Sequence, residues 1–171
     1  MISEVLAGDA FASYARSVNP QFVRMLRAIG FDHRWVRAEG AYLFDADGNR
    51  FLDLLGGYGM FNVGRNNPRV REALVETLAL ETPGSVQLGV DALPGALADE
   101  LLARLPGRLG KILFTNSGTE AVEAAIKLAR GATRRPRVLA LEHAFHGLTT
   151  GSLAVGDAPE FRRPFGALLP G

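Results

Sequence analysis

The stretch KILFTNSGTEAVEAAIKLAR, residues 111–130, is the most informative part of the chain for its fold class. Ile112-Leu113-Phe114 is a run of β-formers, and from Thr119 the chain continues as an alanine-rich stretch with helical spacing. A second β-forming run, Val138 to Leu141, follows this helix. Strand, helix and strand in this order form a βαβ unit with parallel strands. We therefore predict an α/β fold with a parallel sheet flanked by helices.

The segment NSGT, residues 116–119, joins the first predicted strand to the helix. The first N–H groups of a helix lack partners and the aligned peptide dipoles add partial positive charge, so phosphate is a natural ligand there. Gly118 lets the backbone approach an anion closely, while the hydroxyls of Ser117 and Thr119 can add donors. The same residues also suit a simple N-cap, with Glu120 favourable in the first turn. These residues alone leave both interpretations open.

The segment EHAFHG, residues 142–147, follows the second predicted strand. Because ligands of open parallel sheets bind at the carboxyl ends of the strands, Phe145 is expected near the NSGT junction. A planar heteroaromatic cofactor whose phosphate rests on the junction could stack on this ring, although a lone Phe is more often part of a core. The ring therefore favours anion binding over simple capping. His143 and His146 have too few further ligands nearby to predict a metal site.

The chain upstream carries four further predicted elements, read from apolar periodicity and from Pro and Gly punctuation. They are a helix opened by Asn19-Pro20 and stopped by Gly30, a β-hairpin built from residues 35–36, 42–44 and 51–54 around the turn DADG, a helix from Asn67-Pro68 to about Leu80, and a helix from Leu93 to Leu105. A single βαβ unit leaves sheet edges unpaired, so we expect further strands beyond residue 171.

Composition excludes several classes of protein. A hydrophobic content of 47%, a charged content of 22% and 20 glycines are typical of a soluble globular protein rich in turns. A formal net charge of +1 gives no electrostatic reason to expect nucleic acid or an anionic membrane as partner. With no cysteine, disulfides, thiol nucleophiles and zinc–thiolate sites are excluded. The N-terminus lacks the pattern of a signal peptide, so a cytoplasmic location is the expectation.

Three motifs in order resemble the N-terminal half of class III aminotransferases, which are pyridoxal 5'-phosphate (PLP) enzymes of fold type I. They are GAYLFDADGNRFLDLLGGYGMFNVGRNNPRV, NSGTEAVEAAIKLAR and AFHG, and the resemblance extends from about Asn19 to Gly171. It implies a small-domain segment over residues 1–66, followed over residues 67–171 by the beginning of a large PLP-binding domain with a mostly parallel sheet. It also implies a homodimer with active sites at the subunit interface.

The resemblance assigns roles to five residues. The family's phosphate-binding turn corresponds to Ser117, Gly118 and Thr119, and the aromatic residue that stacks on the pyridine ring corresponds to Phe145. Tyr58 corresponds to a position at the substrate entrance, where an aromatic side chain contributes to recognition of the donor amine. These residues are the predicted cofactor-binding and substrate-binding set.

Two departures from the family's pattern restrict the expected activity. Leu148 stands where the subgroup acting on acetylated or succinylated ornithine usually has a carboxylate-binding arginine, and the stretch GGYGMFNVGRNNP looks closest to putrescine and related diamine aminotransferases. The chain's lysines, Lys111 and Lys127, do not match the lysine that forms the Schiff base with PLP. That lysine and the pyridinium aspartate are expected beyond residue 171, so the chain alone is predicted to be inactive.

The implied reaction moves an amino group from a primary amine or an ω-amino donor to a 2-oxo acid. Glutamate-1-semialdehyde aminomutase is an alternative because it shares the Ser-Gly-Thr turn, but that subgroup usually carries Tyr where Phe145 stands. A third interpretation is a non-catalytic fragment that acts only as a folding or dimerisation module or pairs with a complementary chain.

Overall fold

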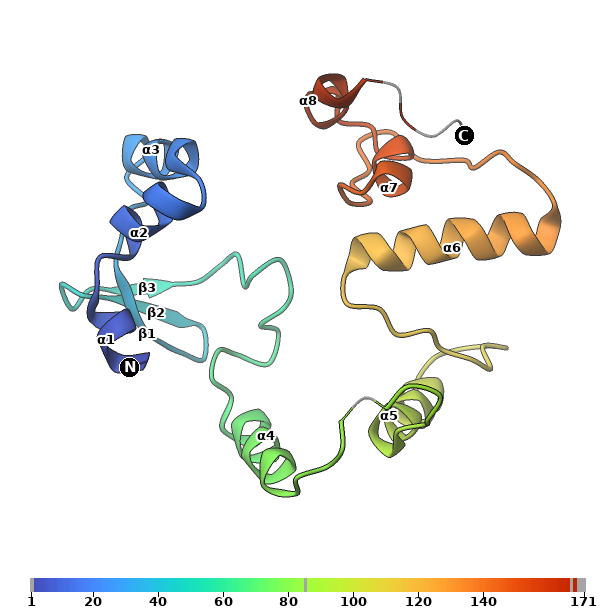
Figure 1. Cartoon of the computed structure of the whole chain (residues 1–171), viewed down its shortest axis with the longest axis horizontal. Coiled ribbons are helices and arrows are strands. Elements are labelled where there is room, and N and C mark those ends of the chain that lie inside the picture. The colour runs from blue at the N-terminus through green and yellow to red at the C-terminus, as the bar shows by residue number, and fades with distance from the viewer. Residues whose placement is uncertain (1, 85, 167, 169–171) are drawn as a thin grey trace. The chain divides into compact units, whose positions relative to one another are not determined.

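The computed structural model describes residues 2–84, 86–166 and 168. The chain divides into two compact units, Met1–Gly84 and Ser85–Gly171, here called the N-terminal and C-terminal units (Figure 1). The predicted division at residue 66 stays a prediction.

The N-terminal unit combines short helices with one three-stranded sheet (Figure 1). Its sheet has the order β1-β2-β3 with antiparallel neighbours throughout. The elements are α1 (Ile2–Ala7), α2 (Ala10–Ser17), α3 (Pro20–Ala28), β1 (Trp35–Glu39), β2 (Tyr42–Asp45), β3 (Arg50–Leu52) and α4 (Pro68–Ala79).

Two helices of this unit begin with the same local signal. The Asn19 side chain accepts a hydrogen bond from the Phe22 N–H at 3.0 Å, and Pro20 occupies the first helical position of α3. Asn67 caps α4 in the same way, with Pro68 at its first position. Asn at the N-cap and Pro at the first position satisfy the orphan donors and preset the backbone, so both predicted helices are confirmed.

The turn between β2 and β3 is organised by one buried carboxylate. Asp45 accepts hydrogen bonds from the N–H groups of Asp47 at 3.0 Å and Asn49 at 2.8 Å, and from the Asn49 side chain at 2.9 Å. These bonds, that of the Asn49 side chain first, hold the pKa of Asp45 below its ordinary value. Leu43 lies opposite Phe51 across the strand pair. The predicted hairpin is therefore confirmed.

The C-terminal unit is helical in its described part. It contains α5 (Ala92–Leu102), α6 (Gly118–Thr133), α7 (Thr150–Ala154), α8 (Pro159–Arg162) and the 3-10 turn η1 (Arg163–Phe165). Helices α5 and α6 confirm two predictions, while α7 and α8, like α1 and α2, were not predicted. No helix within the described residues combines the length and apolar character needed to cross a membrane.

The predicted strands on either side of α6 are not formed. Residues 112–114 and 138–141 have no regular secondary structure, and the sheet β1-β2-β3 is the one sheet found among the described residues. A strand exists only where a neighbour accepts and donates its backbone hydrogen bonds, and these two segments do not pair with each other. The described residues therefore contain the central helix of the predicted βαβ unit without its two strands.

Much apolar surface remains uncovered. The chain exposes 14599 Å², whereas two separate compact bodies of half its mass would together expose about 10,000 Å². Val23 and Leu153 are the buried apolar residues among those described, while Leu88, Val90 and Leu139 are exposed, as are the other large apolar residues of most helices. The described residues thus form local elements without a shared core.

Candidate functional site

The SGT turn, Ser117-Gly118-Thr119, opens α6. The Ser117 hydroxyl accepts a hydrogen bond from the Glu120 N–H at 3.3 Å, and the Glu120 carboxylate accepts one from the Asn116 N–H at 2.7 Å. The first bond satisfies a donor that the helix itself leaves unpaired, and the second holds the residue that precedes the N-cap. The capping interpretation of Ser117 is therefore correct, and the hydroxyl proton of Ser117 is still available to a ligand.

The first two backbone donors of α6 remain open. Among the described residues, nothing accepts a hydrogen bond from the N–H of Gly118 or of Thr119. A Cβ built on Gly118 would meet no atom within 4 Å, so the backbone at Gly118 is open to the approach of a ligand. Two orphan amides at the positive end of a 16-residue helix suit a phosphate group.

Residues 142–148 are here called the Phe145 loop. The Thr119 hydroxyl forms hydrogen bonds with residues that follow this loop. Its oxygen lies 2.7 Å from the Thr149 hydroxyl and 2.6 Å from the Ser152 hydroxyl, and it accepts from the Thr149 N–H at 3.3 Å. The Ser152 residue is 0% exposed. The hydroxyl predicted as a ligand donor therefore joins the start of α6 to the start of α7.

Glu123 completes this junction. Its Oε1 accepts hydrogen bonds from the Thr149 hydroxyl at 2.6 Å, the Gly151 N–H at 2.8 Å and the Ser152 N–H at 3.0 Å. The hydrogen bond from Thr149 lowers the pKa of Glu123 below its usual value, and the two backbone bonds act in the same direction against the opposing effect of burial. Sequence reasoning missed Glu123, although its position four residues after Thr119 places both on one face of α6.

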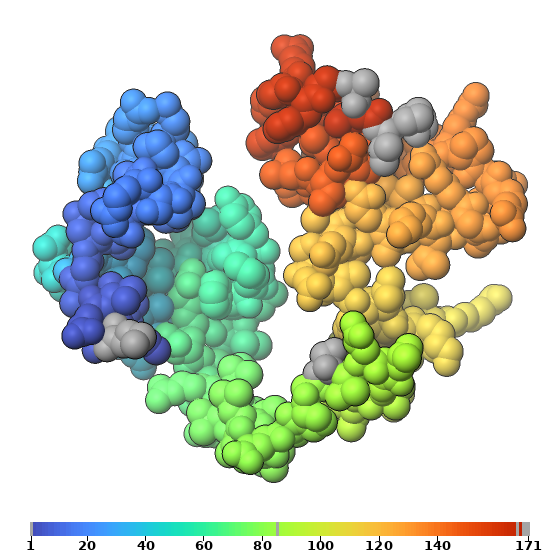
Figure 2. Space-filling model, viewed as in Figure 1, coloured from blue at the N-terminus to red at the C-terminus, as the bar shows by residue number. Residues whose placement is uncertain are grey.

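The Phe145 loop lies against the SGT turn. Gly147 is buried with φ +122°, and a Cβ built on it would stand 2.3 Å from the Thr119 Oγ1. The space-filling view shows the atoms of the α7 region in contact with those of α6 (Figure 2). Phe145 is 65% exposed and meets Phe161 edge-on at 6.1 Å between ring centroids. The structure thus brings the predicted turn and the predicted stacking residue into one region.

Tyr58 belongs to the N-terminal unit. It lies in the glycine-rich loop of residues 56–59, its backbone has φ +56°, and it is 90% exposed. Its ring is therefore accessible to a ligand. Its relation to the four predicted cofactor-binding residues stays a prediction.

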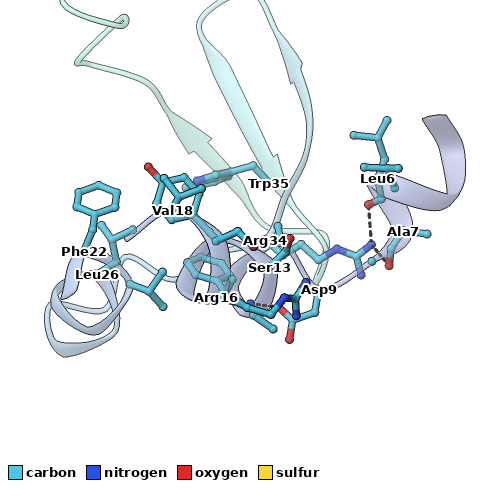
Figure 3. A pocket seen from close by; sticks show the side chains of 18 of the residues that line it. Leu6, Ala7, Asp9, Ser13, Arg16, Val18, Phe22, Leu26, Arg34 and Trp35 are labelled. Carbon is cyan, nitrogen blue, oxygen red and sulfur yellow. Dashed lines mark hydrogen bonds between the residues drawn. The ribbon is translucent and has the colours of Figure 1, made fainter. Parts of the chain in front are cut away.

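A separate pocket of about 1280 Å³ lies in the N-terminal unit (Figure 3). It is bounded by α1, α2, α3 and the beginning of β1, with Phe22, Leu26 and Trp35 among its apolar lining. At the edge of the pocket, the Arg34 side chain donates hydrogen bonds to the backbone oxygens of Leu6 at 3.3 Å and of Ala7 at 3.2 Å in α1. None of the predicted site residues lines this pocket.

Comparison with known proteins identifies a family. A sequence model described as "Aminotransferase class-III" matches residues 30–171. The chain is 44% identical over 172 residues to putrescine aminotransferase from Pectobacterium atrosepticum, covering 95% of the chain and 36% of that protein.

Two solved structures are similar in both sequence and fold. An (S)-enantioselective omega-transaminase from Thermomicrobium roseum matches at a TM-score of 0.77 and 31% identity, covering 87% of this chain and 35% of that one. An amine transaminase from an uncultivated Pseudomonas species, in a PLP-bound form, matches at a TM-score of 0.72 and 32% identity, covering 81% and 33%. The chain spans between 19% and 36% of the length of the curated relatives it matches.

Proposed function

This chain belongs to the class III aminotransferase family, and on that premise we propose that it supplies the phosphate cup and the ring-stacking wall of an aminotransferase. Fold type I is the fold of this family's enzymes, and PLP is the family's cofactor. The observation that carries the proposal is the pairing of two open amides at the start of α6 with an exposed aromatic ring on the adjoining loop.

Each proposed cofactor-binding residue has a separate task. The N–H groups of Gly118 and Thr119 donate to phosphate oxygens, and the α6 dipole favours the negative charge. The Ser117 hydroxyl adds one donor because its oxygen is used as an acceptor in the cap. Phe145 covers one face of the cofactor ring and excludes water from it. When bound, PLP supplies the electron sink that transamination requires.

The proposed substrates are a primary amine or an ω-amino donor and a 2-oxo acid. Support comes from the 44% identity to a putrescine aminotransferase and from Leu148, which offers no charge to a substrate carboxylate. Tyr58 is proposed to contact the donor amine at the entrance. We further propose a cytoplasmic homodimer with a small-domain segment over residues 1–66 and the beginning of the large domain over residues 67–171.

We also propose that residues 1–171 alone do not catalyse transamination. Lys111 precedes the unpaired segment 112–114, and Lys127 lies on α6 next to Glu123. We propose neither of them as the catalytic lysine. Transamination is assayed with this chain, PLP, putrescine and 2-oxoglutarate. We expect no steady turnover and no borohydride-trapped lysine adduct above background, because the catalytic lysine lies outside these residues. Steady turnover would contradict this part of the proposal.

The phosphate cup is tested by ligand binding. Pyridoxamine 5'-phosphate has no aldehyde and cannot modify surface lysines, so its titration reports the cup itself. We expect saturable binding that is lost with pyridoxamine lacking the phosphate and in Gly118→Val, whose side chain fills the space above the amides. Gly110→Val is the control, since a Cβ there also meets nothing within 4 Å but lies outside the turn. Equal binding by both variants would rule out the cup.

A further inference from the structure

We propose that Glu123 is a positioning residue that holds the Phe145 loop and the SGT turn at one fixed separation. This inference rests on the proposed function, because it concerns the two walls of the proposed cofactor site. Glu123 itself does not touch the cofactor in this proposal. It acts through Thr149, Ser152 and Thr119.

Glu123 first serves as the cap of another helix. The N-cap residue of α7, Thr149, makes no side-chain capping bond of its own, because its hydroxyl donates to Glu123 at 2.6 Å. The Glu123 Oε1 instead accepts from the N–H groups of Gly151 and Ser152, the donors that an N-cap side chain normally satisfies. The start of α7 is therefore built on a carboxylate from α6.

Thr149 and Ser152 also contact the SGT turn through their hydroxyls. The hydroxyls of Thr149 and Ser152 lie 2.8 Å apart, and each lies within hydrogen-bonding distance of the Thr119 hydroxyl. Glu123 and Thr119 stand one helical turn apart on α6, so the connection forms a closed ring of hydrogen bonds. Residues 142–148, which carry Phe145, run directly into this ring.

Two glycines show how closely the chain segments approach. A Cβ on Gly151 would stand 2.2 Å from the Glu123 Oε2, and one on Gly147 would stand 2.3 Å from the Thr119 Oγ1. Both distances are too short for any side chain, so α7 and the preceding loop lie in backbone contact with side chains of α6. The separation between Phe145 and the open amides is therefore set at these two positions on either side of Thr149.

The charge of Glu123 and its position predict opposite changes in anion affinity when the side chain is replaced. A carboxylate on the first two turns of α6 repels a phosphate, so removing the charge alone should tighten anion binding. A positioning role predicts the reverse, because loss of the ring of hydrogen bonds frees the loop and the turn. The sign of the change thus separates the two effects.

The test measures the affinity for pyridoxamine 5'-phosphate and the induced circular dichroism of its ring at saturation. Glu123→Ala and Thr149→Val are expected to weaken binding by about tenfold or more and to reduce the ring dichroism. Glu123→Gln should recover part of both, because its amide oxygen still accepts from Gly151 and Ser152. Glu120→Gln is the matched control, which removes a charge nearer the cup and keeps an acceptor for the Asn116 N–H. It should bind as tightly as wild type or slightly more tightly.

Three results would decide against the inference. Wild-type affinity and dichroism in Thr149→Val, which keeps the charge and nearly the volume, would overturn it even if Glu123→Ala does not fold. Tighter binding by both Glu123→Gln and Glu120→Gln would show that charge, not position, is the effect of Glu123. Failure of the wild-type protein to bind the ligand would overturn the proposed function and this inference together, whereas the first two results leave the proposed function intact.

Discussion

The hairpin of the N-terminal unit and the segments that flank α6 contain similar β-forming residues but reach different structures. Leu43 finds its partner Phe51 across a short turn, so β2 and β3 complete each other's hydrogen bonds locally. Residues 112–114 and 138–141 stand on opposite sides of a helix and find no partner among the described residues. An antiparallel pair closes within a few residues, whereas a parallel strand depends on neighbours from distant parts of a chain.

The region around α6 is nevertheless ordered at its start by side chains. Thr119, Glu123, Thr149 and Ser152 form a ring of hydrogen bonds that needs no sheet beneath it. The hairpin is thus organised by backbone pairing, and the candidate site by side-chain pairing.

The largest effect is expected from Gly147→Ala, which forces a Cβ into the Thr119 hydroxyl at a backbone with φ +122°. We expect a loss of about 3 kcal/mol in the free energy of unfolding of the α6–α7 region, from overlap and backbone strain together. Gly131→Ala, inside α6, is the control: nothing lies within 4 Å of a Cβ there, and a gain of up to about 1 kcal/mol is expected. Denaturant unfolding measures both, and equal stability of the two variants would refute the side-chain contact.

Amide hydrogen exchange compares the two regions directly. The N–H of Asp53 donates to the Ala41 oxygen at 2.8 Å, whereas nothing among the described residues accepts from the N–H groups of Leu113 and Leu139. We expect exchange at Asp53 to be slower by about a hundredfold, relative to the intrinsic rates. Comparable protection at Leu113 would show that this segment has found a partner strand, and the contrast would disappear.

Asp45→Ala should weaken the hairpin, because the N–H groups of Asp47 and Asn49 lose their shared acceptor inside the turn. We expect the melting temperature of the N-terminal unit to fall by about 5 °C. Asp47→Ala, in the same turn, removes an exposed carboxylate that no described hydrogen bond uses, and should change little. Equal melting temperatures of the two variants would contradict this role of Asp45 and would show that strand pairing alone holds the hairpin.

The smallest effect concerns pH. The pKa of Glu123 is lowered from 4.5 in the folded state, so its contribution to stability is fully present above pH 4.5 and is lost as the pH falls through the folded pKa. Glu123→Gln lacks this contribution. The difference in melting temperature between wild type and Glu123→Gln should therefore shrink below pH 4.5, and Asp45 and Asp53, whose lowered pKa values act in the same direction, cancel in that difference. A constant difference across pH 3–7 would contradict the role of the charge.

Local signals made much of the fold predictable. Asn19-Pro20 and Asn67-Pro68 mark helix starts because the cap and the first turn involve residues within three positions of each other. The turn DADG marks the hairpin for the same reason. Helix α7 carried no such signal: it has five residues, and its cap comes from Glu123 on another helix.

The candidate site was predictable in part. The SGT turn was expected to offer amides and hydroxyls to an anion, and the amides of Gly118 and Thr119 are open. The Thr119 hydroxyl was expected to face the ligand but pairs with Thr149 and Ser152 instead. Nothing in the spacing of these hydroxyls along the chain could have indicated that pairing.

The sequence by itself determined the helix starts, the hairpin turn and the membership of an aminotransferase family, because each depends on residues close together in the chain or on motifs in a given order. Only the tertiary structure decided which β-forming runs become strands and which hydroxyls remain free. Strand ladders and side-chain contacts join distant residues, as Thr119 and Thr149 are joined across 30 positions. Such contacts form only when folding brings the partners together, so residue type and local spacing do not reveal them.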